Sequence, residues 1–496
     1  MPTPRKPAST VTRPPSSGDR SFAIAILAAG KGTRLKSKHP KVLHCIAGRP
    51  LLEHVVEAAR MLVPAHDIFA VIGHEARRVQ ETLGSTGINF ILQAEQRGTG
   101  HAIQAARHSL VNYDFFVVLS GDVPLIRPET IQTLTDFHLK SAAAMTILTS
   151  EPADPTGYGR IVRVRKQGKA TDLVAAIVEQ GALSSRQLGI REVNSGIYTF
   201  DSRPLFAHLE ELNAGNSQCE LYLTDMAAIL GRAGEKVVAV RSENASEVLG
   251  VNTRAELAAL DTMLRANKCA ELMNSGVTIF RPDTCIIDAQ VSVGQDTVID
   301  PFVQLLGNSR IGTDCQISSG TIIRDTIIGN GVTIKPGCIL TSAQVDEGAV
   351  LGPYSHLRPE ADIGAGAHVG NFVEIKKTRL GKGSKANHLS YLGDATIGDH
   401  VNIGAGTITC NYDGACKHPT IIEDNVFVGS DSILVAPVIV GRGSYVAASS
   451  CITKDVPPGA LALARAPQTN KEGWVAEKRK KHELLETAAG EKGNSS

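Results

Sequence analysis

The sequence lacks paired cysteines, a strong charge of either sign and any long apolar run. Its nine cysteines are scattered singly, with no CxxC pair, which predicts reduced thiols and a cytoplasmic protein without a disulfide framework. The formal net charge of +1 gives no electrostatic reason to expect nucleic acid or a membrane surface as partner. No stretch approaches the ~20 apolar residues of a membrane span. Small anionic ligands, which need only a local site, stay open as partners.

The length of 496 residues is too great for one ordinary core, so we expect two domains. The Pro-, Ser- and Arg-rich start lacks the apolar run of a secretory signal and predicts a disordered leader over residues 1–21. A basic run and a Gly/Ser end predict a solvated C-terminal tail rather than a nucleic-acid arm. The expected domains are 22–254 and 276–474, with a helical linker at 255–275 and the tail at 475–496.

The first half alternates apolar runs with helix-like segments. A continuous apolar run, Phe22 to Ala29, leads directly into Gly30. Further strand candidates lie at 68–73, 116–122 and 145–149, with helical patterns at 51–62 and 98–110 between them. This alternation predicts an α/β fold with a doubly wound, Rossmann-like parallel sheet, whose ligands bind beyond the carboxyl ends of the strands.

Two strand ends carry residues suited to phosphate chemistry. LAAGKGTRL is neither a Walker A motif nor a GxGxxG fingerprint, but its glycines would let backbone N–H groups approach phosphates. Lys31, Arg34 and Lys41 could neutralise a polyphosphate. Asp122 follows an apolar strand, where a carboxylate can hold Mg²⁺. Taken singly, the loop equally fits a plain strand-to-helix turn, and a lone strand-end Asp is more often a cap.

Together the motifs are more specific than any one of them. The strings LAAGKGTRL, PKVLH, QAEQRGTGHA, SGDVPLI, GYGRIVR, IVEQ, EVNSGIY and EVLGVN occur in this order. Residues 22–254 thereby resemble the sugar-1-phosphate nucleotidyltransferases. The resemblance implies transfer of a nucleotidyl group from a nucleoside triphosphate to a sugar phosphate, with release of pyrophosphate. Such an in-line displacement needs alignment and charge neutralisation more than covalent chemistry. Extra residues at about 165–172 set the sugar-side loop apart.

The same resemblance implies roles for individual residues. Those on the nucleotide and its phosphates would be Leu27, Ala28, Ala29, Gly30, Arg34 and Lys41, with Gln93, Gly98 and Thr99 reading uracil. The strand end Ser120, Gly121 and Asp122 would lie beside them, Gly159, Glu179 and Asn194 would hold the amino sugar, and Asp122 and Asn252 would bind Mg²⁺.

In the second half an aliphatic residue returns at every sixth position, apart from one-residue slips before Ile328 and Val345. The series runs through Ile287, Val293, Ile299, Leu305, Ile311, Ile317, Ile323, Ile328, Ile334, Leu340, Val345, Leu351, Leu357, Ile363, Val369 and Ile375, and resumes with Ile422, Val428, Leu434, Val440, Val446 and Ile452. Neither a helix nor an alternating strand has this period, so it predicts a solenoid with flat sides one hexapeptide long. With three hexapeptides per turn it resembles the left-handed parallel β-helix of hexapeptide acyltransferases.

One polar stretch, GAGTITCNYDGACKHPTII at 404–422, interrupts the repeat. An insertion cannot enter the core of a solenoid and must loop outward. The densest polar set surrounds it, and His388 within that set could take a proton from an amine attacking a thioester, because a neutral imidazole titrates near the working pH. Nearby Lys and Arg side chains would bind a phosphate. Single members of the set, such as His368, fit ladder positions of the solenoid better.

Residues 22–474 as a whole are similar to the bacterial family of bifunctional N-acetylglucosamine-1-phosphate uridyltransferases and glucosamine-1-phosphate acetyltransferases, and PQTNKEGW near the C-terminus matches too. The resemblance implies UTP and acetyl-CoA as co-substrates, glucosamine 1-phosphate and N-acetylglucosamine 1-phosphate as acceptors, and UDP-N-acetylglucosamine for peptidoglycan and lipopolysaccharide as product. It implies His388 as general base, with the acceptor held by Arg358, Lys376, Tyr391 and Asn402. Acetyl-CoA would contact Ala405, Ser430, Ala448 and Arg465, while Asn411, Tyr412 and Lys417 would reach a substrate on a neighbouring subunit of a homotrimer.

Three alternatives stay open at this point. A single-activity ADP-glucose pyrophosphorylase would carry a merely regulatory β-helix. A non-catalytic scaffold would resemble the translation-factor exchange subunits, which join the same two folds. A γ-class carbonic anhydrase would need zinc histidines, for which His368, His388 and His400 are the candidates.

Overall fold

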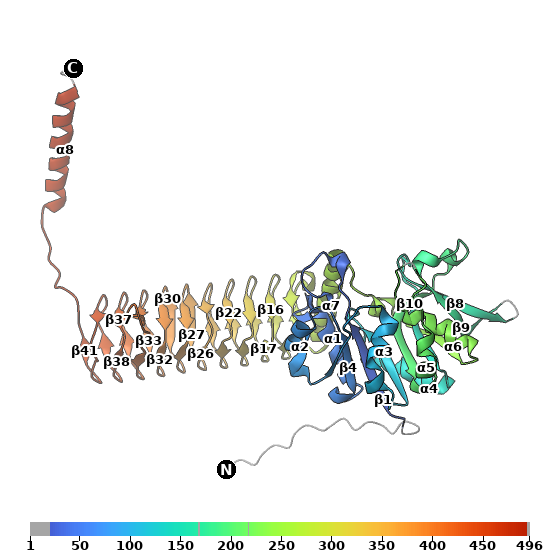
Figure 1. Cartoon of the computed structure of the whole chain (residues 1–496). Coiled ribbons are helices and arrows are strands. Elements are labelled where there is room, and N and C mark those ends of the chain that lie inside the picture. Colours follow the sequence, from blue (N-terminus) through green and yellow to red (C-terminus); the bar gives the residue numbers. More distant parts are fainter. Residues whose placement is uncertain (1–19, 167–168, 217, 494–496) are drawn as a thin grey trace, which may run out of the picture. The chain divides into compact units, whose positions relative to one another are not determined.

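The computed structural model describes residues 20–166, 169–216 and 218–493. The chain divides into two compact units, drawn with their labelled elements in Figure 1. The first unit comprises Met1–Ala270 with Ile287–Ala289, and the second comprises Glu271–Ile286 with Gln290–Ser496. The predicted leader, residues 1–21, lies outside the described residues except at its last two positions.

The first unit contains one large sheet with the strand order β5-β4-β1-β6-β10-β7-β11-β9-β8 in the described part of the chain. Its strands are β1 Phe22–Ala28, β4 Ile68–Ile72, β5 Asn89–Leu92, β6 Phe115–Ser120, β7 Met145–Ser150, β8 Arg160–Lys166, β9 Lys169–Val178, β10 Val193–Asp201 and β11 Val237–Arg241. A separate small pair is formed by β2 Cys45–Ile46 and β3 Arg49–Pro50. The four predicted strands all form, as β1, β4, β6 and β7.

The expected parallel pairing holds for β5, β4, β1 and β6 and for β7 with β11, but not for β10, β9 and β8. β1 pairs parallel with β4 and β6, but β10 pairs antiparallel with both β6 and β7. β10 is reached from the β8–β9 hairpin through two short 3₁₀ turns, with no long helix between. Parallel neighbours are usually joined by a helical crossover, and the connection at 179–192, although long enough, contains no α-helix. The extra residues near 165–172 fall at the turn of that hairpin, of which 167–168 lie outside the described residues.

Alternate residues of β1 pack into two different cores, which shows that the sheet is covered on both faces. Ala23 and Ala25 belong to one cluster, while Ile24 and Ile26 belong to the other. The helices supplying these cores are α1 Leu51–Arg60, α2 Ala76–Leu83, α3 Thr99–Leu110, α4 Pro128–Ser141, α5 Ser202–His208 and α6 Met226–Arg232. The doubly wound prediction is therefore confirmed.

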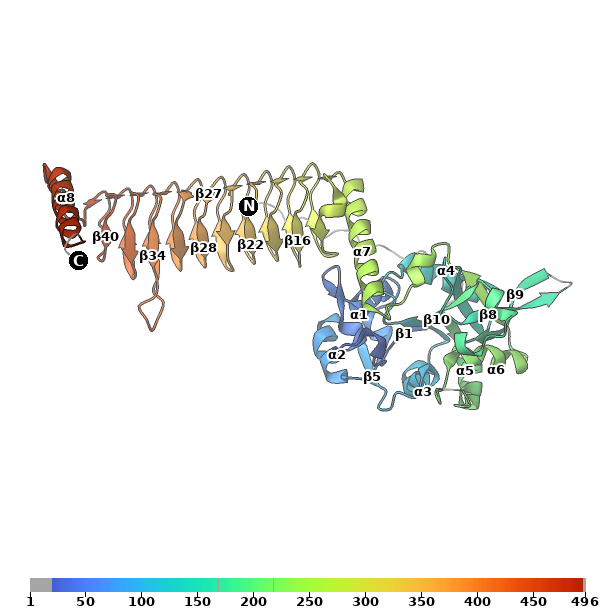
Figure 2. The ribbon, with the colours of Figure 1, turned by 90° about the horizontal axis from the view of Figure 1, so that it is seen from above.

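The second unit is a three-sided parallel β-helix, visible in Figures 1 and 2 as a row of stacked coils. Prism sheet 1 contains β12 Thr278–Ile279, β15 Val298–Ile299, β18 Gln316–Ile317, β21 Thr333–Ile334, β24 Val350–Leu351, β27 His368–Asn371, β30 Lys385–His388, β33 Asn402–Ile403, β36 Phe427–Val428, β39 Tyr445–Val446 and β41 Leu461–Ala462. Prism sheet 2 contains β13 Ile286–Ile287, β16 Gln304–Leu306, β19 Ile322–Arg324, β22 Ile339–Thr341, β25 His356–Leu357, β28 Glu374–Lys376, β31 Tyr391–Gly393, β34 Ile408–Cys410, β37 Ile433–Val435 and β40 Cys451–Ile452. Prism sheet 3 contains β14 Ser292–Val293, β17 Arg310–Ile311, β20 Ile327–Ile328, β23 Gln344–Val345, β26 Ala361–Ile363, β29 Thr378–Leu380, β32 Ala395–Ile397, β35 Thr420–Ile422 and β38 Val438–Val440.

The aliphatic series forms the core of this prism, as its period predicts. Every predicted aliphatic position is buried except Val293 in β14, which is half-buried. The residues stack in register from coil to coil, so that Leu340 pairs with Leu357 and Leu357 with Ile375. A residue on one of these coils therefore has its neighbours 17 or 18 positions away in the sequence, and 25 positions away across the coil that carries the outward loop. The same spacing determines which polar residues lie next to each other on successive coils.

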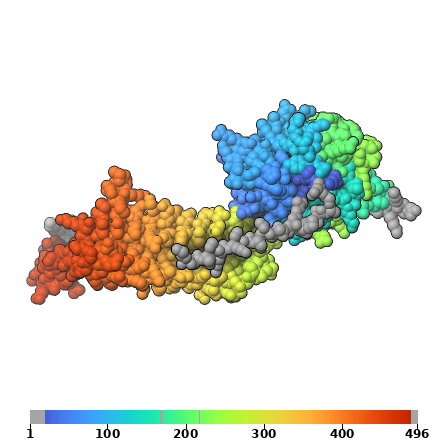
Figure 3. All heavy atoms as spheres, turned by 90° about the horizontal axis from the view of Figure 1, so that it is seen from below, coloured from blue at the N-terminus to red at the C-terminus, as the bar shows by residue number. Residues whose placement is uncertain are grey.

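Two segments depart from the regular elements. The loop between β34 and β35 stands out from the side of the coils in Figures 2 and 3, as predicted for the polar stretch. The predicted linker 255–275 corresponds to the helix α7 Arg254–Asn274. Where the sequence predicts a solvated tail, the structure has the helix α8 Trp474–Gly493, whose described side chains are exposed. Among the described residues, no helix is both long and apolar enough to cross a membrane.

Candidate active sites

The predicted phosphate and metal residues of the first unit lie together at the carboxyl ends of β1 and β6. The Lys41 ammonium forms an ion pair with the Asp122 carboxylate and donates to Asn252 Oδ1 at 3.2 Å. Arg34 Nη2 donates to the same amide oxygen at 2.8 Å. Ser120 Oγ donates to Asp122 Oδ1 at 2.6 Å. Residues up to 218 positions apart are thus joined into one cluster of two cations, a carboxylate and an amide oxygen.

Local backbone geometry holds this cluster in place. Gly32 has a φ of +64°, and a Cβ added there would lie 2.5 Å from Lys41 Cβ, so the loop needs glycine for Lys41 to pass over it. On the other side, Glu256 Oε2 accepts from the backbone N–H groups of Asn252 at 2.5 Å and Thr253 at 2.9 Å, while Thr253 Oγ1 accepts from Glu256 N at 3.2 Å. This capping box begins α7 and fixes Asn252. Sequence reasoning missed Glu256, although the Thr-x-x-Glu spacing could have found it.

The residues predicted to read uracil also lie together, at the start of α3. Gln93 is buried, and its Nε2 donates to the Gly98 carbonyl oxygen at 3.1 Å. Thr99 Oγ1 accepts from Leu223 N at 2.9 Å. A Cβ on Gly98 would lie 2.5 Å from the Leu221 carbonyl oxygen, so this approach requires glycine. The side-chain amide of Gln93 is held before any ligand binds, which suits the selection of one base edge.

The three residues predicted to hold the sugar meet around β8, β9 and β10. Asn194 N donates to the Gly159 carbonyl oxygen at 2.9 Å, and a Cβ on Gly159 would lie 3.4 Å from Glu179 Oε2. Burial raises the pKa of Glu179, although its carboxylate accepts from Thr224 Oγ1 at 3.1 Å. Asn194 Nδ2 donates to the Tyr198 hydroxyl at 2.7 Å, and burial also raises the pKa of that phenol.

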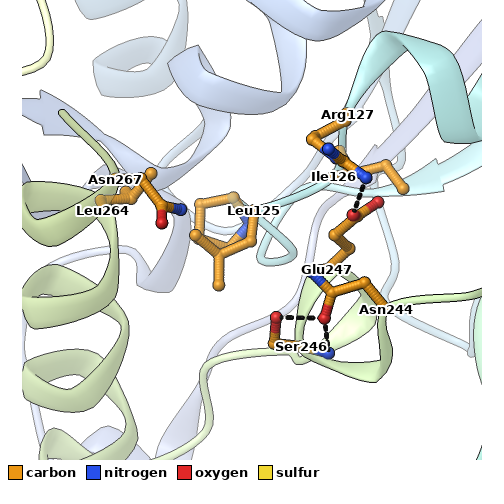
Figure 4. A pocket seen from close by; sticks show the side chains of 9 residues that line it. Leu125, Ile126, Arg127, Asn244, Ser246, Glu247, Leu264 and Asn267 are labelled. Atoms are coloured by element: carbon orange, nitrogen blue, oxygen red, sulfur yellow. Dashed lines mark hydrogen bonds and ion pairs between the residues drawn. The ribbon is translucent and has the colours of Figure 1, made fainter. Parts of the chain in front are cut away.

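A hollow of about 410 Å³ in the first unit is separate from these residues (Figure 4). It is lined by Pro124, Leu125, Ile126, Arg127, Asn244, Ser246, Glu247, Leu264 and Asn267, none of which is a predicted site residue. Figure 4 shows Arg127 paired with the buried Glu247, at 2.5 Å. This ion pair connects the segment after Asp122 with the segment before Asn252. The hollow is therefore lined by parts of the two loops that carry those residues.

One corner of the prism places His388 in line with residues predicted to bind acetyl-CoA. His388 ends β30, and its carbonyl oxygen accepts from Gly406 N at 3.4 Å on the next coil. The Ala405 carbonyl oxygen accepts from Asp431 N at 2.7 Å, and that of Ser430 accepts from Ser449 N at 2.8 Å. His388, Ala405, Ser430 and Ala448 therefore lie on successive coils along one edge. The exposed Arg465 follows Ala464, whose carbonyl oxygen accepts from Cys451 N at 3.2 Å.

The predicted acceptor residues occupy two faces of the prism. Arg358, Lys376 and Tyr391 belong to consecutive coils at prism sheet 2, where Arg358 Nη1 pairs with Glu374 Oε1 at 2.8 Å. Lys417, from the outward loop, approaches Lys376 closely enough that the neighbouring ammonium lowers the pKa of Lys417. Asn402 lies on prism sheet 1, beside Lys385. One chain alone therefore does not bring Asn402 onto the face that carries the other three.

The outward loop is folded upon itself. Asp413 Oδ1 accepts from Ala415 N at 2.8 Å and Cys416 N at 2.7 Å, and His418 Nε2 lies 2.7 Å from Asp413 Oδ2. These bonds lower the pKa of Asp413. Tyr412 is exposed, but Asn411 is buried and its amide donates to Asp394 of the same chain. Within the chain the Asp394 carboxylate engages Asn411, and its role toward a neighbouring subunit stays a prediction.

The matches to known proteins cover both units. Residues 24–217 match the family model of the MobA-like NTP transferase domain. Residues 290–325 match the bacterial transferase hexapeptide (six repeats), and residues 419–454 match the hexapeptide repeat of succinyl-transferase, which agrees with a left-handed β-helix.

Three relatives that match nearly the full length of the chain are all bifunctional GlmU proteins. The bifunctional protein GlmU of Koribacter versatilis is 62% identical, with 93% of this chain and 98% of that protein covered. Those of Solibacter usitatus and Clostridioides difficile are 48% and 44% identical, with 92% and 93% of this chain and 98% and 99% of those proteins covered. The identity extends through both the nucleotidyltransferase unit and the hexapeptide unit, and the chain therefore belongs to the bifunctional GlmU family.

Proposed function

We propose that this chain makes UDP-N-acetylglucosamine in two steps on two separate sites. The second unit transfers the acetyl group of acetyl-CoA to glucosamine 1-phosphate, and the first unit joins the product to UMP from UTP with release of pyrophosphate. The observation that carries this proposal is the presence of two residue sets on one chain, the Asp122 cluster and the His388 corner, each suited to one of these reactions.

In the first unit, Arg34 and Lys41 would bind the phosphates, and the buried Gln93 would hold the uracil edge. Glu179 and Asn194 would orient the sugar, so that an oxygen of its phosphate faces the α-phosphorus of UTP. That oxygen forms the new P–O bond while pyrophosphate leaves, and fixed cations stabilise the charge that develops. The Asp122 carboxylate and the Asn252 amide oxygen fit Mg²⁺, which supplies charge neutralisation on the phosphates when bound.

In the second unit, His388 would take the proton from the amine of glucosamine 1-phosphate as the nitrogen attacks the thioester carbonyl. The C–S bond then breaks, and the proton can pass to the departing thiolate of CoA. The nearby Lys376 side chain lowers the pKa of Lys417, and a phosphate placed between the two ammonium groups would offset their mutual repulsion.

The predicted homotrimer is part of this proposal. Beside His388, the corner carries Tyr354, Phe372 and Leu389 on consecutive coils, exposed by 56%, 57% and 64%. The rings of Tyr354 and Phe372 stack at 5.7 Å. Such a cluster of exposed apolar side chains favours an interface with another copy of the chain. That copy would also bring its own Asn402 to the prism sheet 2 face, which carries Arg358, Lys376 and Tyr391. The cytoplasmic location and the domain limits 22–254 and 276–474 stay predictions.

A coupled assay tests the function. The full chain is given glucosamine 1-phosphate, acetyl-CoA, UTP and Mg²⁺, and both free thiol and pyrophosphate are measured. We expect thiol release even without UTP. We expect pyrophosphate release only with the complete mixture, or when N-acetylglucosamine 1-phosphate replaces glucosamine 1-phosphate and acetyl-CoA. Pyrophosphate without thiol would favour a single-activity pyrophosphorylase with a regulatory β-helix. Release of neither would favour a non-catalytic scaffold.

A further inference from the structure

The ammonium of Lys41 occupies the position between the two side chains proposed to bind Mg²⁺. It pairs with Asp122 and donates to Asn252 Oδ1 at 3.2 Å. The side chains of Lys41 and Asp122 are only 14% and 17% exposed, so this is a partly desolvated contact rather than a loose surface pair. A cation of the protein itself therefore already bridges the two oxygen donors.

Further hydrogen bonds engage the same side-chain oxygens of Asn252 and Asp122. Arg34 Nη2 donates to the same Asn252 oxygen at 2.8 Å, so the two lone pairs of that amide oxygen face two cationic donors. Asp122 Oδ1 accepts from Ser120 Oγ at 2.6 Å, while the other carboxylate oxygen faces Lys41. A divalent cation that binds both Asp122 and Asn252 must therefore displace Lys41 or Arg34 from the amide oxygen, and the Lys41 ammonium beside Asp122 opposes its entry.

The chain offers a divalent cation little to replace those contacts. Among the described residues there is no group of three or more His, Cys, Asp or Glu side chains able to hold a metal. Mg²⁺ dehydrates reluctantly and is commonly held by one or two carboxylates together with phosphates of the substrate. Asp122, paired with Lys41, should therefore bind a metal weakly until a bound nucleotide adds its phosphate oxygens as ligands.

We propose, building on the uridyltransferase function above, that Lys41 holds the place of the metal in the empty site and thereby makes Mg²⁺ and UTP bind cooperatively. The triphosphate attracts Lys41 and Arg34 away from Asp122 and Asn252, and the vacated oxygens then accept the metal. By linkage, the factor by which UTP tightens metal binding equals the factor by which the metal tightens UTP binding.

The surrounding structure explains why Lys41 acts as such a counterion. Its stem passes over Gly32 at a distance that leaves no room for a Cβ, which restricts where the ammonium can go. Asn252 is fixed from the other side by Glu256, which accepts from its backbone N–H at 2.5 Å. The stem of Lys41 and the backbone of Asn252 are therefore held in place, while the Lys41 ammonium at the end of its side chain can still move to a phosphate.

The test measures binding of Mn²⁺ alone, by electron paramagnetic resonance, to the full chain and its variants without nucleotide. Lys41→Gln should bind Mn²⁺ about tenfold more tightly than the unmodified chain, because charge-assisted hydrogen bonds to the metal ligands are removed. Lys38→Gln, which removes an exposed cation of the same segment, is the matched control and should change little. Asp122→Ala should abolish Mn²⁺ binding at this site in the unmodified chain and in both lysine variants.

A second measurement follows UTP binding, corrected for the Mn²⁺–UTP complex in solution. In the unmodified chain Mn²⁺ should tighten UTP binding by the same factor by which UTP tightens Mn²⁺ binding, and that factor should shrink in Lys41→Gln. If Lys41→Gln and Lys38→Gln bind Mn²⁺ alike, the placeholder role is wrong, even if pyrophosphate release by the unmodified chain upholds the uridyltransferase. Absence of pyrophosphate release together with tighter Mn²⁺ binding by Lys41→Gln would overturn the function and leave the lysine–metal competition standing.

Discussion

The two units assemble their sites by different means. In the first unit, Arg34 and Asn252 are 218 positions apart and meet because separate strand ends share one edge of a sheet. In the second unit, His388, Ala405, Ser430 and Ala448 meet because each coil lies in register on the last. The first site forms only if the crossovers, turns and helix caps of the first unit each adopt their observed conformation. Most of the second site follows from the regular stacking of the coils. The two sites should therefore fail independently, and for different structural reasons.

The largest expected effect separates the two activities. His388→Ala should lower acetyl transfer by about 10²–10⁴-fold, because the general base is lost, and leave pyrophosphate release from N-acetylglucosamine 1-phosphate and UTP unchanged. Asp122→Ala should produce the reverse pattern. Thiol and pyrophosphate release, measured separately on each variant, check this. Loss of both activities from either single change would mean that the two units do not work as separate sites.

The next effect contrasts the stability of the two cores. Leu357→Ala in the prism and Leu119→Ala in β6 each remove a fully buried side chain, and each should cost about 2–5 kcal/mol of unfolding free energy. In a solenoid each coil contacts only its neighbours, so Leu357→Ala should speed amide hydrogen exchange mainly in the coils beside it. Leu119→Ala should speed exchange across the sheet. Leu463→Ala, at a 61% exposed leucine, is the control and should change little. Equally local effects from both core changes would remove the distinction between the units.

The same contrast explains what could be predicted from the sequence. The six-residue period alone predicts the prism and the burial of its aliphatic residues, because the interval between core residues is set by the length of a flat side. For the first unit, periodicity predicts strands and helices but not that β10 runs antiparallel to β6 and β7, since periodicity within a strand does not encode its direction in the sheet. The contacts of Lys41 with both Asp122 and Asn252, and the pairing of Asn411 with Asp394, depend on side-chain positions that no spacing specifies.

A smaller effect tests how much the first site depends on its turns. Gly32→Ala forces a φ of +64° on a residue with a Cβ and presses that Cβ against Lys41, which costs about 1–2 kcal/mol from the backbone alone. We expect uridyl transfer to fall by about tenfold or more and acetyl transfer to stay unchanged. Gly231→Ala in α6 is the matched control, because an added Cβ meets nothing within 4 Å there and helix propensity improves. Equal activity of the two variants would show that Lys41 tolerates displacement.

The smallest expected effect concerns the second site, where the outward loop brings Lys417 beside Lys376. A neighbouring positive charge disfavours the protonated form, so the pKa of Lys417 is lowered, and Lys376→Met should raise it. At a fixed pH below that pKa, an amine-reactive reagent should then label Lys417 more slowly in the variant, because less neutral amine is present. Lys385→Met, on prism sheet 1, removes a charge from another face and should leave the labelling rate of Lys417 unchanged. Inorganic phosphate should slow labelling in the unmodified chain more than in Lys376→Met, because an anion between two ammonium groups stabilises both protonated forms. If the two variants label alike, the loop does not hold Lys417 beside Lys376, and the phosphate site would have to be completed by other residues.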